Sequence, residues 1–145
     1  FNRESGKNPF LLHEELKDHM QKHVGILRTQ AVLEEGLVGI EKIRGEVATI
    51  KVEDNRHFNA AWHEAFDMRN MMVCAEAMCR AAMLRKESRG AHAREDFEKM
   101  DDAHFGKVSI VSKRHSALGS METKEIPLPE VPQEIKDVLD AKGES

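Results

Sequence analysis

The sequence predicts a mostly α-helical domain with an irregular, partly β tail. Charged residues make up 33% and apolar residues 40% of the chain, a balance typical of soluble helical proteins. Apolar residues recur at intervals of three and four in successive segments up to Leu84, which is the period of amphipathic helices. Beyond that point, β-branched alternation and three prolines favour strands and extended chain. At 145 residues, one domain is expected.

The first helix is expected to begin at Pro9 and to end at Gly25. Asn8 can accept hydrogen bonds from free N–H groups as N-cap, and proline fits the first helical position. Its apolar stripe consists of Leu12, Leu16, Met20 and Val24. His19 and His23 have the i,i+4 spacing that can hold a transition metal. The sequence places no third ligand of a suitable type, so we expect no metal site.

The second helix is expected to follow the capping residue Thr29, with an apolar stripe of Leu33, Leu37 and Ile40. Gly36 and Gly39 lie beside this stripe and cost about 1 kcal/mol each against Ala in a helix interior. They indicate that another helix, or the backbone of a partner, comes close. Gly45 leaves two possibilities, because the helix can continue or break there, with residues 46–52 as a separate turn or short strand.

The third helix, capped by Asn59, is the longest expected element. Small residues and Met form a near-heptad seam, which allows close helix packing: Ala61, Ala65, Met68, Met72, Ala75, Cys79 and Ala82. A second apolar stripe predicts burial on two sides, as in the central member of a bundle: Phe58, Trp62, Phe66, Val73 and Leu84. Arg69, Glu76 and Arg80 lie between the seams and are expected to solvate a face.

The tail is expected to contain a β-hairpin and a closing helix. Residues 107–113 alternate and are β-branched, which predicts a strand. Residues 121–126 are expected to pair with it across a turn near Gly119 and Ser120. Prolines then impose an extended path before a short helix that carries Ile135, Val138 and Leu139.

Several classes of function are disfavoured by the composition and the motifs. A net charge of −4 argues against a nucleic-acid interface, no apolar run approaches the roughly 18 residues of a membrane span, and no glycine-rich phosphate loop follows a strand. Cys74 and Cys79 lie five apart in a helix, so we expect no disulfide or CxxC pair and place both in the core. His63 and Glu64 begin an HExxH zinc motif, but Asp67 stands where the second His is needed.

The most informative stretch, residues 85–96, directly follows the third helix. Its four basic groups and three carboxylates predict mutual pairing or an anionic partner. Gly90 indicates a positive φ or a close approach, and His92 is the best catalytic candidate by residue type, with flanking cations that disfavour its protonation. A structural clasp between subdomains is the more frequent role for such a stretch. We therefore assign a structural and interface clasp to Arg85, Glu87, Arg89, Gly90, His92, Arg94 and Asp96.

Charge balance also predicts the partners within the clasp. Arg89, His92 and Arg94 are expected to pair with carboxylates drawn from Glu87, Asp96, Asp101 and Asp102.

Three blocks of residues occur in order along the chain: ELKDHM at residues 15–20, AWHEA at residues 61–65 and RKESRGAHAREDF at residues 85–97. Together they resemble the C-terminal helical domain of the succinate dehydrogenase and fumarate reductase flavoprotein subunits. The resemblance is clear over residues 8–102. Glu98 and Met100 depart from the family, which usually has a Pro and a basic residue there.

The resemblance implies an antiparallel, spectrin-repeat-like three-helix bundle. We accordingly expect a lead-in or linker over residues 1–8, the bundle with its clasp over residues 9–104, and the tail over residues 105–145. It also implies a parent flavoprotein of the tricarboxylic acid cycle and electron transport, in which hydride passes between succinate and FAD. In that family the preceding FAD-binding and capping domains hold FAD and the catalytic residues. No catalytic, cofactor-binding or metal residue is therefore assigned to this chain, which is expected to be inactive alone.

The expected partners are the FAD-binding and capping domains of the parent and an iron–sulfur subunit, with no nucleic acid and no direct membrane insertion. The implied location is cytoplasmic, at the inner face of the cell membrane through partner subunits. Two alternatives are the C-terminal domain of L-aspartate oxidase, which shares an Arg-Gly signature, and a free-standing helical module whose clasp captures an acidic partner.

Overall fold

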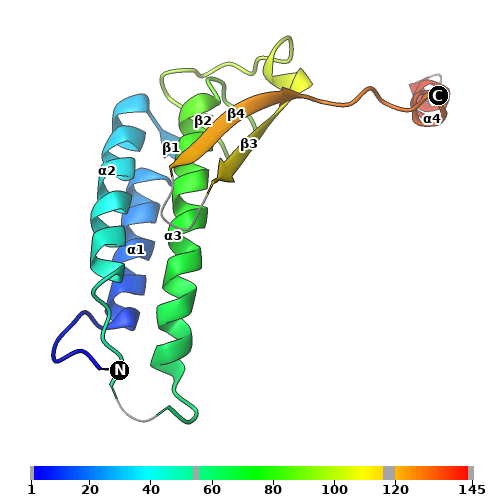
Figure 1. Ribbon diagram of the computed structural model, residues 1–145. Coiled ribbons are helices and arrows are strands. Elements are labelled where there is room, and N and C mark those ends of the chain that lie inside the picture. Colours follow the sequence, from blue (N-terminus) through cyan, green and yellow to red (C-terminus); the bar gives the residue numbers. More distant parts are fainter. Residues whose placement is uncertain (1, 54–55, 116–119, 144–145) are drawn as a thin grey trace.

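Three long helices form a bundle, a β-hairpin lies against the third helix near one end of it, and a fourth helix lies away from the bundle (Figure 1). The computed structural model describes residues 2–53, 56–115 and 120–143. The elements in chain order are α1 (Pro9–His23), β1 (Leu27–Arg28), α2 (Gln30–Val47), α3 (Ala60–Leu84), β2 (Ala93–Arg94), the 3₁₀ helix η1 (Phe105–Lys107), β3 (Val108–Arg114), β4 (Met121–Pro127) and α4 (Gln133–Gly143). The expected helical bundle with a partly β tail is confirmed.

The three helices of the bundle begin at the predicted capping residues. The side chain of Asn8 accepts hydrogen bonds from two N–H groups in the first turn of α1. Thr29 accepts one from the first turn of α2, and Asn59 accepts one from the first turn of α3. Of the two possibilities at Gly45, the structure shows the continuous helix, because α2 runs on to Val47.

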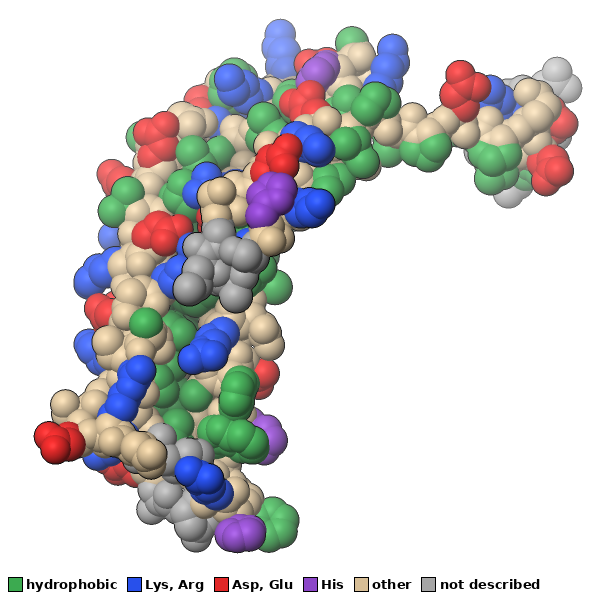
Figure 2. Space-filling model, in the orientation of Figure 1, with side chains coloured by type: hydrophobic (Ala, Val, Ile, Leu, Met, Phe, Trp, Pro, Cys, Tyr) green, Lys and Arg blue, Asp and Glu red, His purple; other side chains and the backbone are tan. Residues whose placement is uncertain are grey.

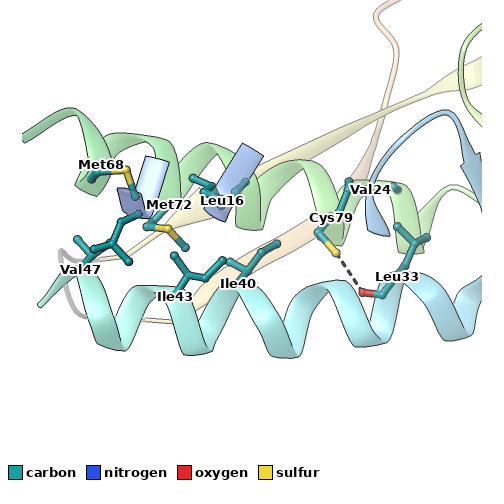
Figure 3. Packing of buried hydrophobic residues seen from close by; sticks show 12 residues of the cluster. Leu16, Val24, Leu33, Ile40, Ile43, Val47, Met68, Met72 and Cys79 are labelled. Carbon is teal, nitrogen blue, oxygen red and sulfur yellow. Dashed lines mark hydrogen bonds between the residues drawn. The ribbon is translucent and has the colours of Figure 1, made fainter. Parts of the chain in front are cut away.

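One hydrophobic core lies between α1, α2 and α3 (Figure 3). It consists of Leu12, Leu16, Val24, Leu33, Ile40, Ile43, Val47, Met68, Met72, Ala75, Cys79 and Ala82. The Cys79 thiol donates a hydrogen bond to the carbonyl oxygen of Leu33 at 3.2 Å, which links α3 to α2. Burial raises the pKa of this thiol to about 11, so it remains a protonated donor.

Gly36 and Gly39 of α2 allow α1 to pack closely, as expected. A Cβ atom at Gly39 would lie 2.1 Å from Cε1 of His19, and one at Gly36 would lie 3.0 Å from Cβ of His23. His19 Nε2 also donates to the carbonyl oxygen of Gly36 at 2.8 Å. The histidine pair of α1 therefore packs against α2, and these contacts account for the glycines.

Three expectations for α3 were wrong. Cys74 is exposed rather than in the core, and Phe58, Trp62 and Phe66 of the second stripe are 105%, 41% and 49% exposed. Glu76, which was expected to solvate a face, is only 2% exposed. The reason is that α1 and α2 cover one side of α3, and helical periodicity alone does not say which apolar side receives those neighbours.

The tail forms the predicted hairpin and closing helix. Strands β3 and β4 pair antiparallel, with Val108 opposite Pro127 and Arg114 opposite Met121. The turn expected near Gly119 falls partly outside the described residues. Helix α4 lies away from the bundle (Figure 1), and none of the described helices combines the length and apolarity needed to cross a membrane. Within the expected lead-in, Lys7 forms a parallel bridge with Ile50.

Candidate functional site

Three helix ends meet at one end of the bundle, and the clasp lies against them. Because α2 runs opposite to α1 and α3, its first turn lies beside the last turns of the other two (Figure 1). The last carbonyl groups of a helix lack intrahelical donors and carry partial negative charge, whereas its first N–H groups lack acceptors and carry partial positive charge. Cations are therefore suited to the ends of α1 and α3, and an anion to the start of α2.

The side chain of Arg94 caps the C-terminal end of α3. It has no exposed area, and its Nη1 donates to the carbonyl oxygens of Ala82 at 2.8 Å and Met83 at 3.3 Å. Nε and Nη2 donate to the two carboxylate oxygens of Asp96 at 2.7 and 2.8 Å. The guanidinium carbon lies 5.0 Å from the ring centre of Phe97. A buried cation is thus matched by a bidentate carboxylate and by free carbonyl groups.

Asp96 continues this network to α2. Its Oδ2 accepts a hydrogen bond at 2.9 Å from the backbone N–H of Gln30, the first residue of α2. The hydrogen bond from Arg94 is the main reason why the pKa of Asp96 falls to about 2, and the N–H of Gln30 adds to the effect against the opposing effect of burial. The ionised pair of Arg94 and Asp96 therefore joins the end of α3 to the start of α2.

A second connection runs from α1 to α3 through Arg28 and His92. Arg28 donates to the carbonyl oxygens of Gly25 at 2.5 Å and Val24 at 3.2 Å, at the end of α1. Its Nη1 also donates to His92 Nδ1 at 2.5 Å, and His92 Nε2 donates to the carbonyl oxygen of Arg85 at 3.0 Å. Both ring nitrogens are therefore engaged.

His92 has the properties of a neutral structural imidazole. Burial is the main cause that lowers its pKa; the hydrogen bond to the carbonyl group of Arg85 opposes this, and the neighbouring guanidinium groups lower the pKa further. Because Nδ1 accepts from Arg28, only Nε2 carries a proton. Its use as a general acid or base would require breaking one of these two contacts.

Glu87 is the buried anion at the centre of the rest of the clasp. It has no exposed area and accepts hydrogen bonds from Arg85, from Arg89 at 2.9 and 3.0 Å, and from the backbone N–H of Asp101 at 2.8 Å. The contact with Arg89 is the main reason why the pKa of Glu87 falls to about 2, although burial opposes it. Arg89 also donates to Asp102 at 2.7 Å. Asp101 therefore contributes a backbone group rather than its carboxylate to Glu87.

A tight turn brings these side chains together. Arg89 and His92 exchange backbone hydrogen bonds of 2.8 and 3.0 Å, and Gly90 between them has a φ of +57°. Apart from Gly90 itself and its two chain neighbours, no described residue has an atom within 4 Å of the position that a Cβ of Gly90 would occupy. The glycine is therefore explained by its backbone conformation rather than by a close approach.

Sequence reasoning missed three residues of this network. Arg28 and Gln30 belong to the segment that precedes and opens α2, where β1 pairs parallel with β2 in the register Leu27 to Ala93. Ser88 Oγ accepts from the backbone N–H of Arg94 at 2.8 Å. The sequence signal for Arg28 was its position as a cation directly before Thr29, the N-cap of α2. Its partner His92 lies 64 residues further along the chain, so the sequence alone does not pair the two.

The clasp is a network of mutually satisfied charges. His19 and His23 have ring centres 4.5 Å apart, but Nε2 of His19 already donates to a carbonyl group. Within residues 2–53, 56–115 and 120–143, no three or more His, Cys, Asp or Glu side chains converge as metal ligands. The contacts of the clasp hold the adjoining ends of α1, α2 and α3 in a fixed relation to one another.

Comparison with known proteins gives consistent matches. The family described as fumarate reductase flavoprotein C-term matches residues 13–137. The succinate dehydrogenase flavoprotein subunit of Coxiella burnetii is 34% identical over 105 residues, which cover 72% of this chain and 18% of that protein. The subunit of the same name from Rickettsia felis is 35% identical over 85% of this chain and 21% of its own length.

Solved structures of similar proteins share the fold. The Mycobacterium smegmatis Sdh1 complex matches with a TM-score of 0.80 at 33% identity, over 89% of this chain and 23% of that chain. Quinol fumarate reductase of E. coli matches with a TM-score of 0.79 at 25% identity, over 90% of this chain and 23% of that chain. The chain spans about a fifth of the length of these two curated relatives.

Proposed function

Because the chain belongs to the family of C-terminal domains of fumarate reductase and succinate dehydrogenase flavoproteins, we propose that it is the structural and docking domain of such a flavoprotein. The parent protein interconverts succinate and fumarate with FAD and passes electrons to an iron–sulfur partner. FAD, when bound, supplies the hydride chemistry. The present chain supplies shape and contact surface.

The observation that carries this proposal is the saturation of the clasp. The buried groups Glu87 and Arg94 have their hydrogen bonds met by neighbouring groups of the same chain, and both ring nitrogens of His92 are engaged. A dicarboxylate or an isoalloxazine would have to displace these internal partners. The clasp residues therefore do not fit a flavin or substrate site, which supports placing FAD in the domains that precede this one in the family.

The proposal extends to the remaining organisation of the protein. These relatives are about four times as long as this chain, which leaves room for FAD-binding and capping domains outside it. We assign docking to the bundle with its clasp over residues 9–104 and to the tail over residues 105–145. We further propose that the parent lies at the cytoplasmic face of the membrane through its partner subunits, as the resemblance to the family implies.

Variants of the clasp in the complete natural polypeptide test this function. Arg89→Ala removes the donor to Glu87 and Asp102, so it should lower the melting temperature and the flavin content. The KM for succinate should stay unchanged in the fraction that keeps flavin. Lys86→Ala is the matched control, because Lys86 is exposed and forms no ion pair with any described residue. Unchanged stability and flavin content in Arg89→Ala would refute the clasp, and an altered KM at full flavin content would indicate a role in catalysis.

A further inference from the structure

A groove lies between α2 and α3, away from the clasp. It encloses about 850 Å³ and is bounded by both helices and by the end of β3. A smaller hollow of about 150 Å³ continues it toward the start of α3, since both are lined by Val47, Ala48 and Arg69. We call the two together the α2–α3 groove. Figure 2 shows hydrophobic and basic side chains side by side on the face of the bundle below the hairpin.

The α2–α3 groove is basic although the whole chain carries a net charge of −4. Its walls hold four arginines, Arg44, Arg69, Arg80 and Arg114, against the two carboxylates of Glu41 and Glu76. Glu76 is buried and accepts from Arg44 at 2.6 Å and from Arg80 at 2.8 Å. Burial opposes ionisation of Glu76, but the hydrogen bonds from both arginines lower its pKa, so it is an anion. Two positive charges remain in excess.

Two of these arginines, Arg69 and Arg114, lack hydrogen-bond acceptors within the part of the chain that the structure describes. Arg114 is 15% exposed, yet its nearest carboxylate oxygen, on Glu76, is 3.9 Å away, and none of the described residues accepts a hydrogen bond from it. The buried Nε atoms of Arg114 and Arg44 have no hydrogen-bond partner among the described residues either. Arg69 is exposed and makes no ion pair with the described residues. A guanidinium presents five donors, and covering them without acceptors costs free energy, so the arginines of the groove are suited to an anionic partner.

The other end of the groove is apolar. Trp62 and Phe66 line the smaller hollow with ring centres 5.2 Å apart, and both remain more than 40% exposed. Exposed aromatic side chains beside arginines are the composition enriched in protein interfaces. A small anion would satisfy the arginines but leave these rings uncovered. A protein segment with carboxylates at one end and apolar side chains at the other matches both parts.

We propose that the α2–α3 groove binds an acidic segment of the same polypeptide, located in the domains that precede this chain. This inference rests on the proposed function, since it takes the missing four-fifths of the relatives' length as the source of the segment. A covalently linked partner is present at a high effective concentration, so a few ion pairs and two aromatic contacts are sufficient for stable docking. Carboxylates of the segment meet Arg69 and Arg114, and its apolar side chains cover Trp62 and Phe66.

Photo-crosslinking in the complete polypeptide tests the inference. Benzoylphenylalanine in place of Asn70, on the groove wall, should crosslink to an upstream peptide that contains several Asp or Glu residues. The same probe in place of Lys22, exposed on α1, is the matched control and should not crosslink to that peptide. Arg69→Glu should lower the yield at Asn70 about tenfold, as expected for loss and reversal of one interfacial charge, whereas Lys22→Glu should not.

Other outcomes would overturn the inference. Crosslinks from Asn70 to another subunit would make the groove an intersubunit surface, and an absence of protein crosslinks would mean that nothing docks there. A yield unaffected by Arg69→Glu but abolished by inorganic phosphate would identify a small-anion site instead. Flavin measured in the same sample separates this inference from the proposed function. A flavin-loaded polypeptide without the expected crosslink refutes only the groove, and a polypeptide without flavin refutes the proposed function.

Discussion

Replacement of Arg94 by Met should lower the free energy of unfolding of the chain by about 3 to 5 kcal/mol, the range for removing one partner of a buried ion pair. Met keeps much of the length of the side chain, so the packing is largely preserved. It donates no hydrogen bond, so the carbonyl groups at the end of α3 and the carboxylate of Asp96 lose their donors. The perturbation is therefore electrostatic rather than steric.

The burial of Arg94 and Asp96 decides where the loss in the free energy of unfolding falls within the range of about 3 to 5 kcal/mol. The side chain of Arg94 is fully buried, whereas that of Asp96 is 29% exposed and keeps the N–H of Gln30 as a donor. Water can therefore solvate part of the unpaired carboxylate, which moves the expected loss toward 3 kcal/mol. The carbonyl oxygen of Ala82 is less accessible, and an unsatisfied buried group of this kind costs about 1 to 3 kcal/mol.

Urea unfolding followed by circular dichroism measures this loss. Lys86→Met is the control, because Lys86 is exposed and the expected change is within about 0.5 kcal/mol. Arg94→Lys keeps the charge but loses the planar fork, so it should fall between Arg94→Met and the unmodified chain. If Arg94→Met loses no more than Lys86→Met, the guanidinium does not hold the helix ends together, and the account of the clasp is wrong.

Three further predictions concern the buried carboxylates of the clasp, the turn at Gly90 and the packing of α1 against α2. The folded-state pKa values of Glu87 and Asp96, each about 2, lie below their ordinary values, so their stabilisation is present near neutral pH and is lost as pH falls. Urea midpoints should therefore decrease from about pH 5 to about pH 2, and a flat profile would contradict the buried ion pairs. Gly90→Ala should cost about 1 to 2 kcal/mol through its positive φ, and Gly90→Asn should cost less; equal losses would contradict this reason. Gly39→Ala should cost about 1 to 3 kcal/mol because of the clash with His19. The loss should disappear in a His19→Ala background, and an undiminished loss there would show that the clash is not the cause.

Local signals explain what could be predicted from the sequence. Asn8, Thr29 and Asn59 each cap N–H groups no more than three residues away, so the starts of the helices depend on short segments alone. The pairs of Arg94 with Asp96 and of Arg89 with Glu87 span two residues each, and charge balance placed both carboxylates among four candidates without assigning them to particular arginines.

The remaining contacts depend on how distant segments pack. Arg28 reaches His92 only because β1 lies parallel to β2, and no local pattern encodes that pairing. Glu76 is buried because Arg44 of the neighbouring helix and the end of the hairpin cover it. The exposure of Cys74 likewise depends on where α1 and α2 lie around α3, which the period of an apolar stripe does not determine.

The most direct test of the central claim compares the complete natural polypeptide with the 145-residue chain for bound flavin and for succinate oxidation. We expect a flavin spectrum and succinate-dependent reduction of an artificial electron acceptor in the complete polypeptide, and neither property in the chain alone. Flavin or succinate bound by the isolated chain, or a complete polypeptide without flavin, would contradict the assignment of a structural and docking role.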